Sequence, residues 1–466
     1  MTLTAADIVE AVGGRLLSGA PHAVIPGFSI DSRTTGAGDL FVAIRGERFD
    51  GHAFVDAALA RGASGALVSE PGAGVTHDLV SDRVLIAVAD TTLALQRLAW
   101  WVRRRAGARV VAITGSAGKT TTKEMAAAFL GLRYRVMRSS GNLNNHIGLP
   151  LSLLELRHDP EVAVVELGMN HAGEISRLVA IAEPDVRVWT NVAEVHIEFF
   201  GSVAAIADAK AEVLEGATAD TLLVANADDS LVMDRARRFA GRTVTFSTTG
   251  EATVSAANIE DAGLAGIRAL VRTPVGARRL ELPLAGRANL ENALAAIAVA
   301  LEFGVPIDEV AERARTLRPA AHRGDVLRLA RGITVVDDAY NANPRAVRGA
   351  LAILAGETGF ARRVAVLGEM LELGSRSQAL HEAVGGVAAG SGLSWLLTVG
   401  GEPARALGRA AVAAGMSPAA VWHADTSAEA AAVAVAAVRP GDLVLVKGSR
   451  GIGTERVVER LAAEFG

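Results

Sequence analysis

Residues 109–131 read RVVAITGSAGKTTTKEMAAAFLG, and this stretch decides the fold of the surrounding chain. A β-rich apolar run enters a glycine-containing loop, and a helical segment that ends at Gly131 follows the loop. Such a loop lets backbone N–H groups face phosphate oxygens at a helix N-terminus. Lys119 would then reach the terminal phosphates, and Thr120 would offer its hydroxyl to Mg²⁺. The alternative is an ordinary glycine turn, but the strand, loop and helix in sequence favour a phosphate-binding loop.

Strand and helix patterns alternate on both sides of this loop, which is typical of a parallel sheet with crossover helices. A helix is expected at 91–106, a β insertion at about 245–284 and a further helix at 286–304. A second alternation starts near residue 320 and ends in an amphipathic helix at 454–466. The clearest strand patterns lie at 28–33, 39–44, 65–69, 84–88, 162–168, 186–192, 221–226, 333–338, 363–368, 395–400, 420–424 and 442–448.

The length of 466 residues corresponds to about three domains. The pattern predicts an α/β protein with a small N-terminal α/β domain at 1–88 and a central phosphate-loop domain at 89–319. A Rossmann-like domain is expected at 320–466, although no GxGxxG motif follows its first strand, so no dinucleotide site is predicted.

Composition excludes several classes of protein. The net charge of −4 gives no global basic field, so nucleic acid is not the expected partner. Cysteine is absent, which excludes disulfides and thiol catalysis and suits a reducing cytoplasm. The N-terminus does not resemble a signal peptide, and no apolar run reaches the roughly 18 residues that a membrane helix needs. We therefore expect a cytoplasmic protein without a membrane span.

Lysine is rare in this chain. Of the 47 basic residues other than histidine, only four are lysine: Lys119, Lys123, Lys210 and Lys447. Arginine supplies nearly all the positive charge, so each lysine is a candidate for a position that requires a primary amine.

Several further segments, in order along the chain, resemble those of the Mur ligases, which form amide bonds at the expense of ATP. They include IDSRTTGAGDLFVAIRGERFDGHAF from residue 30, TGSAGKTTTKEM from 114, TNVAEVHIEFFGS from 190 and VKGSRG from 446. The phosphate loop TGSAGKTT also resembles that of the Mur ligases, because Ile113 stands where the generic phosphate-loop motif has its first glycine. GNLNN (141–145), ELGMNHAGEI (166–175), DDAYNANP (337–344) and GEMLELG (368–374) resemble the branch that adds D-alanyl-D-alanine.

The resemblance implies a nucleotide and metal site. ATP would be held by the loop residues Gly115, Ser116, Ala117, Gly118, Lys119, Thr120 and Thr121. Mg²⁺ would be bound by Thr120, Glu166, His196 and an N-carbamate on Lys210, an adduct that requires an amine able to lose its proton. From the residues alone, Glu166 at a strand end and Lys210 in a helix have ordinary structural explanations.

The resemblance also places residues of the later segments near ATP. Asn289 and Asn292 share a helix face and would lie near the adenine or the phosphates. Arg323 would contact the γ-phosphate, with Arg318 as the alternative, and Asp338 would lie by the nucleotide. A polar helix start and an Asx-type turn are the corresponding structural alternatives.

The remaining site residues are expected to contact the two other substrates. Ser32 and Arg33 suit the uracil and diphosphate of a UDP-linked sugar peptide, because a hydroxyl and a forked cation match those groups. Asn144 and Asn145 would contact its muramoyl-peptide part. The dipeptide and ATP would be contacted by Tyr340, Asn341 and Asn343, and Lys447 would contact an amine substrate or a carboxylate.

The implied reaction is phosphorylation of the terminal carboxylate of UDP-N-acetylmuramoyl-tripeptide by ATP, followed by attack of the amine of D-alanyl-D-alanine. Lys119, Lys210, His196, Glu166 and Arg323 would form the catalytic set. The family also implies a monomer. The alternatives are a sister ligase that adds diaminopimelate or lysine, a folylpolyglutamate-type ligase, and a nucleotide switch or non-catalytic binding module.

Overall fold

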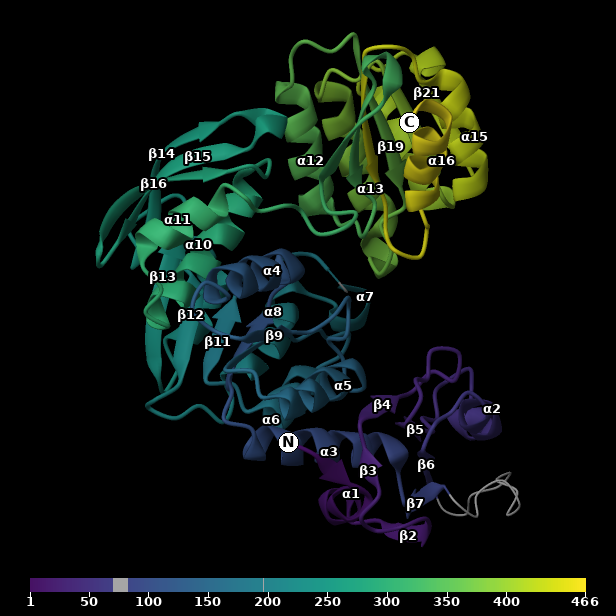
Figure 1. Ribbon diagram of the computed structural model, residues 1–466. Coiled ribbons are helices and arrows are strands. Elements are labelled where there is room, and N and C mark those ends of the chain that lie inside the picture. Colours follow the sequence, from purple (N-terminus) through teal and green to yellow (C-terminus); the bar gives the residue numbers. More distant parts are fainter. Residues whose placement is uncertain (70–82, 196) are drawn as a thin grey trace. The chain divides into compact units, whose positions relative to one another are not determined.

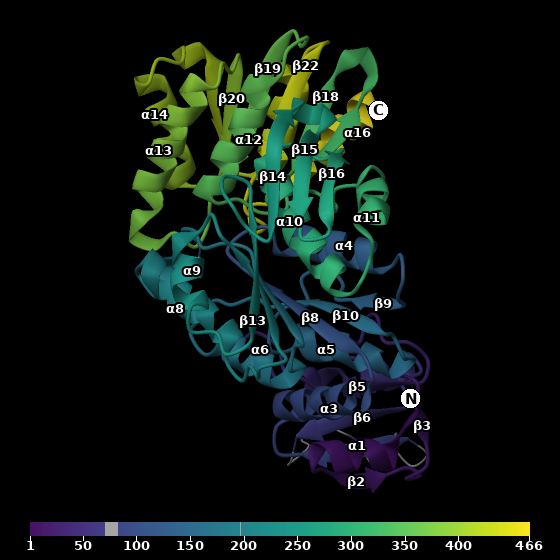
Figure 2. The same ribbon diagram turned by 90° about the vertical axis from the view of Figure 1, so that its left-hand side faces the viewer.

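The fold follows the alternating pattern of the sequence, with parallel strands joined by helices (Figures 1 and 2). The structure is a computed structural model that describes residues 1–69, 83–195 and 197–466. It contains two compact units, each described here by itself. The first comprises residues 1–112, 134–169 and 173–186, and the second comprises residues 113–133, 170–172 and 187–466. The predicted α/β class is confirmed.

The N-terminal sheet of the first unit has the strand order β2-β7-β6-β5-β4. Strands β4, β5, β6 and β7 are parallel to one another, and β2 is antiparallel to β7. The bounds are β2 Arg15–Ser18, β4 Gly27–Ser29, β5 Asp39–Val42, β6 Gly65–Ser69, β7 Val84–Val88, α1 Ala5–Val12, α2 Val55–Ala60 and α3 Thr91–Arg105, with β1 Leu3–Thr4 paired to β3 Val24–Ile25. Helix α1 begins at a capping box formed by Thr4 and Asp7. The strand-rich pattern predicted neither α1 nor α2, because both are short.

The central sheet has the order β16-β15-β14-β13-β12-β11-β8-β10-β9. The expected β insertion is part of this sheet, since β14 pairs in parallel with β13 and then continues into antiparallel β15 and β16. The strands are β8 Arg109–Thr114, β9 Val136–Arg138, β10 Val162–Glu166, β11 Val186–Trp189, β12 Leu222–Asn226, β13 Arg242–Ser247, β14 Val254–Asp261, β15 Ile267–Thr273 and β16 Gly276–Leu282.

Helix α10 is the most deeply buried helix of the central region. Its residues from Ala293 to Ala300 are all buried, because the alanine-rich sequence is apolar on every face. It packs against α4 and against strands β12 to β15. The helices here are α4 Lys119–Leu130, α5 Gly148–Leu154, α6 Glu174–Ala182, α7 Ile197–Phe200, α8 Val203–Ala211, α9 Ser230–Ala236, α10 Arg287–Glu302 and α11 Ile307–Ala314.

The C-terminal sheet has the order β17-β18-β22-β19-β20-β21 and is parallel except for β17. Helices α15 and α16 pack on one face, while α12, α13 and α14 lie on the other (Figures 1 and 2). The register places Asp338 opposite Lys447 at the carboxyl ends of β18 and β22. The bounds are β17 Asp325–Arg328, β18 Thr334–Asp338, β19 Arg362–Gly368, β20 Trp395–Val399, β21 Val421–Ala424, β22 Asp442–Lys447, α12 Pro344–Gly356, α13 Ser377–Gly390, α14 Glu402–Ala413, α15 Ser427–Ala437 and α16 Glu455–Phe465.

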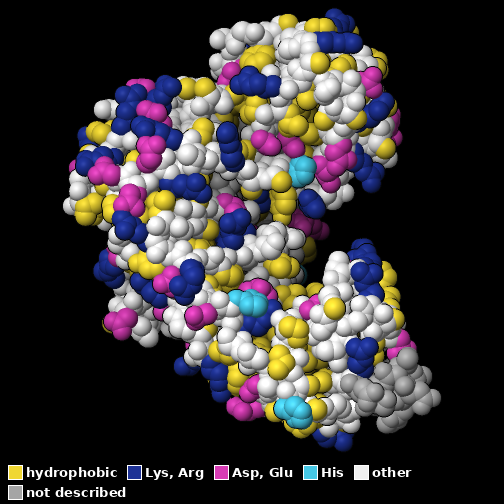
Figure 3. All heavy atoms as spheres, viewed as in Figure 1, with side chains coloured by type: hydrophobic (Ala, Val, Ile, Leu, Met, Phe, Trp, Pro, Cys, Tyr) yellow, Lys and Arg dark blue, Asp and Glu magenta, His cyan; other side chains and the backbone are white. Residues whose placement is uncertain are grey.

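Acidic and basic side chains are interspersed on the surface around β14, β15, β16 and α11 (Figure 3). Exposed ion pairs account for this mixture: Arg278 pairs with Asp308, and Arg315 pairs with Glu312 at 2.8 Å. Within the described ranges, none of the helices has the length and apolar character needed to cross a bilayer.

Candidate active site

The loop between β8 and α4 is built from glycines that approach other side chains closely. Gly115 has φ +148° and Gly118 has φ +83°, a backbone conformation that favours glycine. A Cβ atom at Gly115 would collide with the hydroxyl of Thr190, and one at Gly118 would collide with the side-chain oxygen of Asn292. Both positions therefore require glycine for their backbone conformation and for their surroundings.

Residues just after β11 hold this loop in place. The backbone oxygen of Asn191 accepts the N–H of Ser116 at 2.9 Å, and its side-chain oxygen accepts the N–H of Ala117 at 2.9 Å. Thr190 donates its hydroxyl to the backbone oxygen of Ala117 at 2.7 Å. Sequence reasoning assigned no role to Thr190 or Asn191, although two polar residues directly after a buried strand were a usable signal.

Lys119 begins α4 and its Nζ donates to the backbone oxygen of Gly115 at 2.8 Å. The amine thus lies over the loop whose N–H groups it would assist in binding phosphate. Thr122, one turn into α4, donates to the side-chain oxygen of Asn292 at 3.2 Å.

The two asparagines of α10 have different surroundings. Asn292 is 6% exposed, and its side chain lies against Gly118 of the loop and accepts a hydrogen bond from Thr122. Asn289 donates instead to the backbone oxygen of Ala285 at 2.8 Å, at the start of its own helix. The structure therefore brings one of the two predicted residues to the loop through its side chain.

Lys210 lies near the end of α8 with 2% of its surface exposed. Burial, and secondly the positive charge of nearby Lys119, hold the pKa of Lys210 well below its ordinary value. The chain after α8 is fixed by Arg187, a buried β11 residue whose Nη1 donates to the backbone oxygen of Val213 at 2.6 Å. The predicted metal ligand His196 lies outside the described residues.

Glu166 ends β10 and is 4% exposed. Its carboxylate accepts the side-chain amide of Asn144 at 2.8 Å, so these two predicted residues are neighbours in the first unit. Asn145 caps the start of α5, because its side-chain oxygen accepts the N–H groups of Ile147 and Gly148. In the parts of the chain that the structure describes, no three Asp, Glu or His side chains form a metal-sized cluster.

Arg323 is the predicted arginine that contacts the phosphate loop. Its Nη2 donates to the hydroxyl of Thr120 at 3.0 Å, and its guanidinium lies 4.0 Å from the centre of the Tyr340 ring. A contact of this kind adds a cation–π attraction to the hydrogen bond. Arg450 also faces the same ring, at 5.4 Å.

Lys447 and its neighbours lie at the carboxyl ends of β18 and β22. Its Nζ donates to Asp338 at 2.7 Å and to the backbone oxygen of Asn341 at 2.9 Å, and the residue is 3% exposed. The predicted substrate contact is thus buried in an ion pair with another predicted residue. Asn343 caps α12, since its side-chain oxygen accepts the N–H of Ala346 at 2.9 Å.

The predicted uridine-binding residues follow β4. The guanidinium of Arg33 is largely exposed and forms a forked pair with Asp31, at 2.6 Å for the shortest contact. Hydrogen bonds from the Arg33 side chain and backbone lower the pKa of Asp31 to about 2. Ser32 lies in the turn between them. The arrangement holds a fork-shaped cation at the surface of the first unit.

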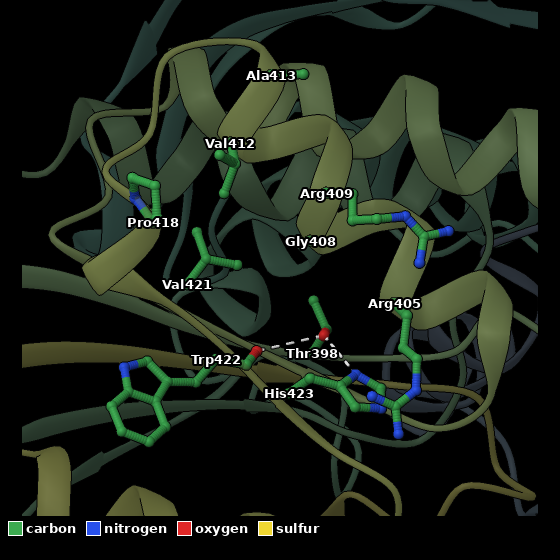
Figure 4. A pocket seen from close by; sticks show the side chains of 10 residues that line it. All are labelled: Thr398, Arg405, Gly408, Arg409, Val412, Ala413, Pro418, Val421, Trp422 and His423. Carbon is green, nitrogen blue, oxygen red and sulfur yellow. Dashed lines mark hydrogen bonds between the residues drawn. The ribbon is translucent and has the colours of Figure 1, made fainter.

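A separate pocket of about 540 Å³ lies between α14 and β21 (Figure 4). Apolar side chains, including Val412, Val421 and Trp422, line one part of it, and Arg405 and Arg409 line another. Both arginines already pair with carboxylates, those of Asp425 and Glu402. None of the described residues predicted for the site lines this pocket.

Comparisons with known proteins cover almost the whole chain. Residues 24–100 match the Mur ligase family catalytic domain, residues 113–300 the Mur ligase middle domain, and residues 322–450 the Mur ligase glutamate ligase domain. The chain is 36% identical to the UDP-N-acetylmuramoyl-tripeptide–D-alanyl-D-alanine ligase of Escherichia coli (strain K12), over 99% of this chain and 98% of that protein. It is 34% identical to the enzyme of the same name from Bacillus subtilis (strain 168), over 98% of each.

Solved structures agree with these matches. A crystal structure of MurF from Acinetobacter baumannii superposes with a TM-score of 0.87 at 31% identity and covers 99% of both chains. MurF ligase from Thermotoga maritima, in complex with ADP, gives a TM-score of 0.81 at 30% identity over 94% of this chain and 98% of that one. With full-length relatives above 30% identity and three matching domains in order, the chain belongs to the Mur ligase family.

Proposed function

We propose that this chain is an ATP-dependent ligase that joins D-alanyl-D-alanine to the terminal carboxylate of UDP-N-acetylmuramoyl-tripeptide in the synthesis of peptidoglycan precursors. The phosphate loop carries this proposal, because hydrogen bonds with Thr190 and Asn191 hold it in a conformation that requires positive φ at Gly115 and Gly118. The substrates in this proposal are taken from the names of relatives that match this chain over nearly its whole length.

The chemistry requires activation, because a carboxylate is a poor electrophile. Transfer of the γ-phosphoryl group of ATP to the carboxylate gives an acyl phosphate and ADP. The dipeptide amine then attacks the acyl carbon, loses a proton, and the tetrahedral intermediate expels phosphate. Lys119 and Arg323 would neutralise charge on the phosphates during the transfer, and the chain's main task is to position the reactants.

We also propose a Mg²⁺ site from the family pattern, because hydroxyl and carboxylate oxygens are ligands that this ion prefers, and the ion would neutralise phosphate charge when bound. Thr120 offers a hydroxyl and Glu166 a buried carboxylate oriented by Asn144, while His196 is proposed from the family pattern. The buried amine of Lys210 has a lowered pKa, and the neutral amine is the form that adds CO₂. We propose that the neutral amine of Lys210 adds CO₂ and releases one proton, which gives an anionic carbamate whose oxygens could bind the metal.

The remaining site residues are proposed to bind the other substrates, each from its own domain. Domain 1–88 would hold the uridine diphosphate through Ser32 and Arg33, whose fork could exchange Asp31 for a diphosphate. Domain 89–319 would hold ATP, with Asn144 and Asn145 near the muramoyl-peptide. Domain 320–466 would present the dipeptide near Tyr340, Asn341, Asn343 and Lys447, with Asp338 by the nucleotide. We further propose a cytoplasmic location, because ATP and nucleotide-linked sugars are cytoplasmic metabolites, and a monomer, which the family pattern implies.

The decisive test measures phosphate release from ATP with each substrate present alone and with both together. We expect release only when UDP-N-acetylmuramoyl-tripeptide and D-alanyl-D-alanine are both present, with a pentapeptide product of the corresponding mass. Single amino acids in place of the dipeptide should give little product, which separates this ligase from its sister enzymes. Lys119→Met should reduce turnover by about 10²- to 10³-fold, since it removes a charge that acts on the transferring phosphoryl group. Hydrolysis at the same rate without an amine would instead indicate a nucleotide switch.

A further inference from the structure

We propose that His322 is a positioning residue, which fixes the backbone that carries Arg323 to the phosphate loop. This inference rests on the proposed function, because it assumes that Arg323 acts on the phosphates of ATP. His322 belongs to the segment before β17 and was not among the residues expected to act in the site.

The backbone of His322 adopts a conformation that an L-residue rarely takes. Its φ is +59°, in the left-handed region that favours glycine and is uncommon for other residues. Neighbouring hydrogen bonds hold it there: its backbone oxygen accepts the N–H of Tyr340 at 3.0 Å, and the N–H of Gly324 donates to the backbone oxygen of Asp337 at 2.8 Å. Backbone strain that is maintained by surrounding hydrogen bonds is typical of functional positions.

The imidazole of His322 is held by a buried carboxylate. Its Nδ1 lies 2.7 Å from Oδ2 of Asp337, a β18 residue whose side chain is only 7% exposed. The other oxygen of Asp337 accepts the N–H of Ala339 at 3.2 Å. Burial raises the pKa of Asp337, and the hydrogen bond from His322 opposes that rise, so the histidine stabilises the ionised carboxylate.

Arg323 is connected to His322 both along the chain and through Tyr340. The residue follows His322 directly, donates to the hydroxyl of Thr120 at 3.0 Å and faces the ring of Tyr340 at 4.0 Å. Tyr340 is in turn bonded through its N–H to His322. The main chain of His322 therefore connects the backbone that carries Arg323 with that of Tyr340, and the His322 imidazole anchors this segment to Asp337. Its loss should displace the guanidinium rather than remove it.

The test is a double-mutant cycle on phosphate release with His322→Asn, Arg323→Ala and the double variant. Asparagine tolerates the left-handed backbone, so the variant removes the imidazole and its bond to Asp337 without adding backbone strain. We expect His322→Asn to lower kcat/KM for ATP by about 10- to 100-fold, because a displacement of about 1 Å can cost 10²-fold. The KM for UDP-N-acetylmuramoyl-tripeptide should not change. In the Arg323→Ala background the same substitution should change kcat/KM by less than about 2-fold, because coupled residues are not additive.

A matched control is His423→Asn, which removes another histidine–aspartate contact, the one at 3.2 Å between His423 of β21 and Asp425. It should leave kcat/KM for ATP unchanged. Asp337→Asn provides a second variant if His322→Asn does not fold, and it should show the same non-additivity with Arg323→Ala. Equal losses in both backgrounds, or no loss in either, would overturn the inference. If the wild type forms no product, the proposed function fails, while calorimetric binding of an ATP analogue to the same four proteins still tests the role of His322.

Discussion

At the scale of single residues, the rarity of lysine is explained by where the lysines lie. Lys123, Lys210 and Lys447 are 1%, 2% and 3% exposed, although lysine is ordinarily a surface residue. Lys119 lies over the phosphate loop. Lys123, for which the sequence indicated no role, lies inside α4 beside Glu124 at 3.3 Å. Three of the four lysines are therefore buried, while arginine supplies nearly all the other basic side chains.

The buried amine of Lys210 leads to a prediction about stability and pH. Because its pKa is lower in the folded protein than in the unfolded chain, the unfolded state binds the extra proton between those two values. The stability of the wild type should therefore rise with pH across that window. Lys210→Met lacks this titration and should be more stable than the wild type near neutral pH, with the difference shrinking as pH approaches about 10.4.

Urea denaturation in carbonate-free buffer at several pH values measures this difference. Lys447→Met is the control, because it leaves the carboxylate of Asp338 without its partner at 2.7 Å and should be less stable than the wild type near neutral pH. A Lys210→Met protein that is less stable than the wild type and shows no trend with pH would contradict the expectation.

At the scale of elements, several polar residues of the recognised segments form hydrogen bonds with backbone groups at helix starts. Asn145 accepts the N–H groups at the start of α5, and Asn343 accepts the N–H of Ala346 at the start of α12. Asn289 contacts Ala285 just before α10. The Asx-type turn that the sequence allowed at 337–344 is present, because the side chain of Asp337 accepts the N–H of Ala339 at 3.2 Å. A substrate role for Asn343 would have to coexist with its capping role.

The two roles of Asn343 can be separated by substitution. Asn343→Ala should destabilise the protein by about 1 kcal/mol, because it removes the cap of α12. Asn343→Ser should keep most of that stability, since serine is also a good N-cap. If Asn343 contacts the dipeptide, Asn343→Ser should still raise the KM for D-alanyl-D-alanine. Thermal unfolding and steady-state kinetics measure the two effects, and a serine variant with unchanged KM would restrict Asn343 to its structural role.

At the scale of the whole molecule, the proposed reaction brings together three ligands that are assigned to different domains. Such reactions usually involve domain closure, which excludes water and completes the site. Some groups that would meet the nucleotide are already connected within the second unit, where Arg323 bonds to Thr120, a residue 203 positions earlier in the chain. Arg376 also pairs with Glu194 at 2.8 Å, and Arg345 pairs with Glu291 at 3.4 Å.

We predict that closure of the C-terminal domain accompanies turnover. Small-angle X-ray scattering should show a smaller radius of gyration when a non-hydrolysable ATP analogue and UDP-N-acetylmuramoyl-tripeptide are added together. The control is Lys119→Met, which should bind the nucleotide more weakly. Its radius of gyration should decrease less than that of the wild type at the same ligand concentrations. An unchanged radius in the wild type at saturating ligands would argue against closure.

Local patterns predicted most of the framework. The run 109–131 became β8, the glycine loop and α4, and the helix expected at 91–106 became α3, Thr91–Arg105. These assignments succeed because hydrophobic period and glycine position act over a few residues. The resemblance correctly identified the family and pointed to the loop, while the roles of the individual site residues remain proposals.

The sequence by itself determined the elements, the phosphate loop and the family, because each is specified by residues close together along the chain. Only the tertiary structure decided which candidates meet. It selected Arg323 over Arg318 and Asn292 over Asn289 for contact with the loop, paired Lys447 with Asp338, and placed Asn191 and His322 in supporting positions. The physical reason is that these contacts join residues up to 203 positions apart, where strand order and register, rather than local propensity, set the distance between side chains.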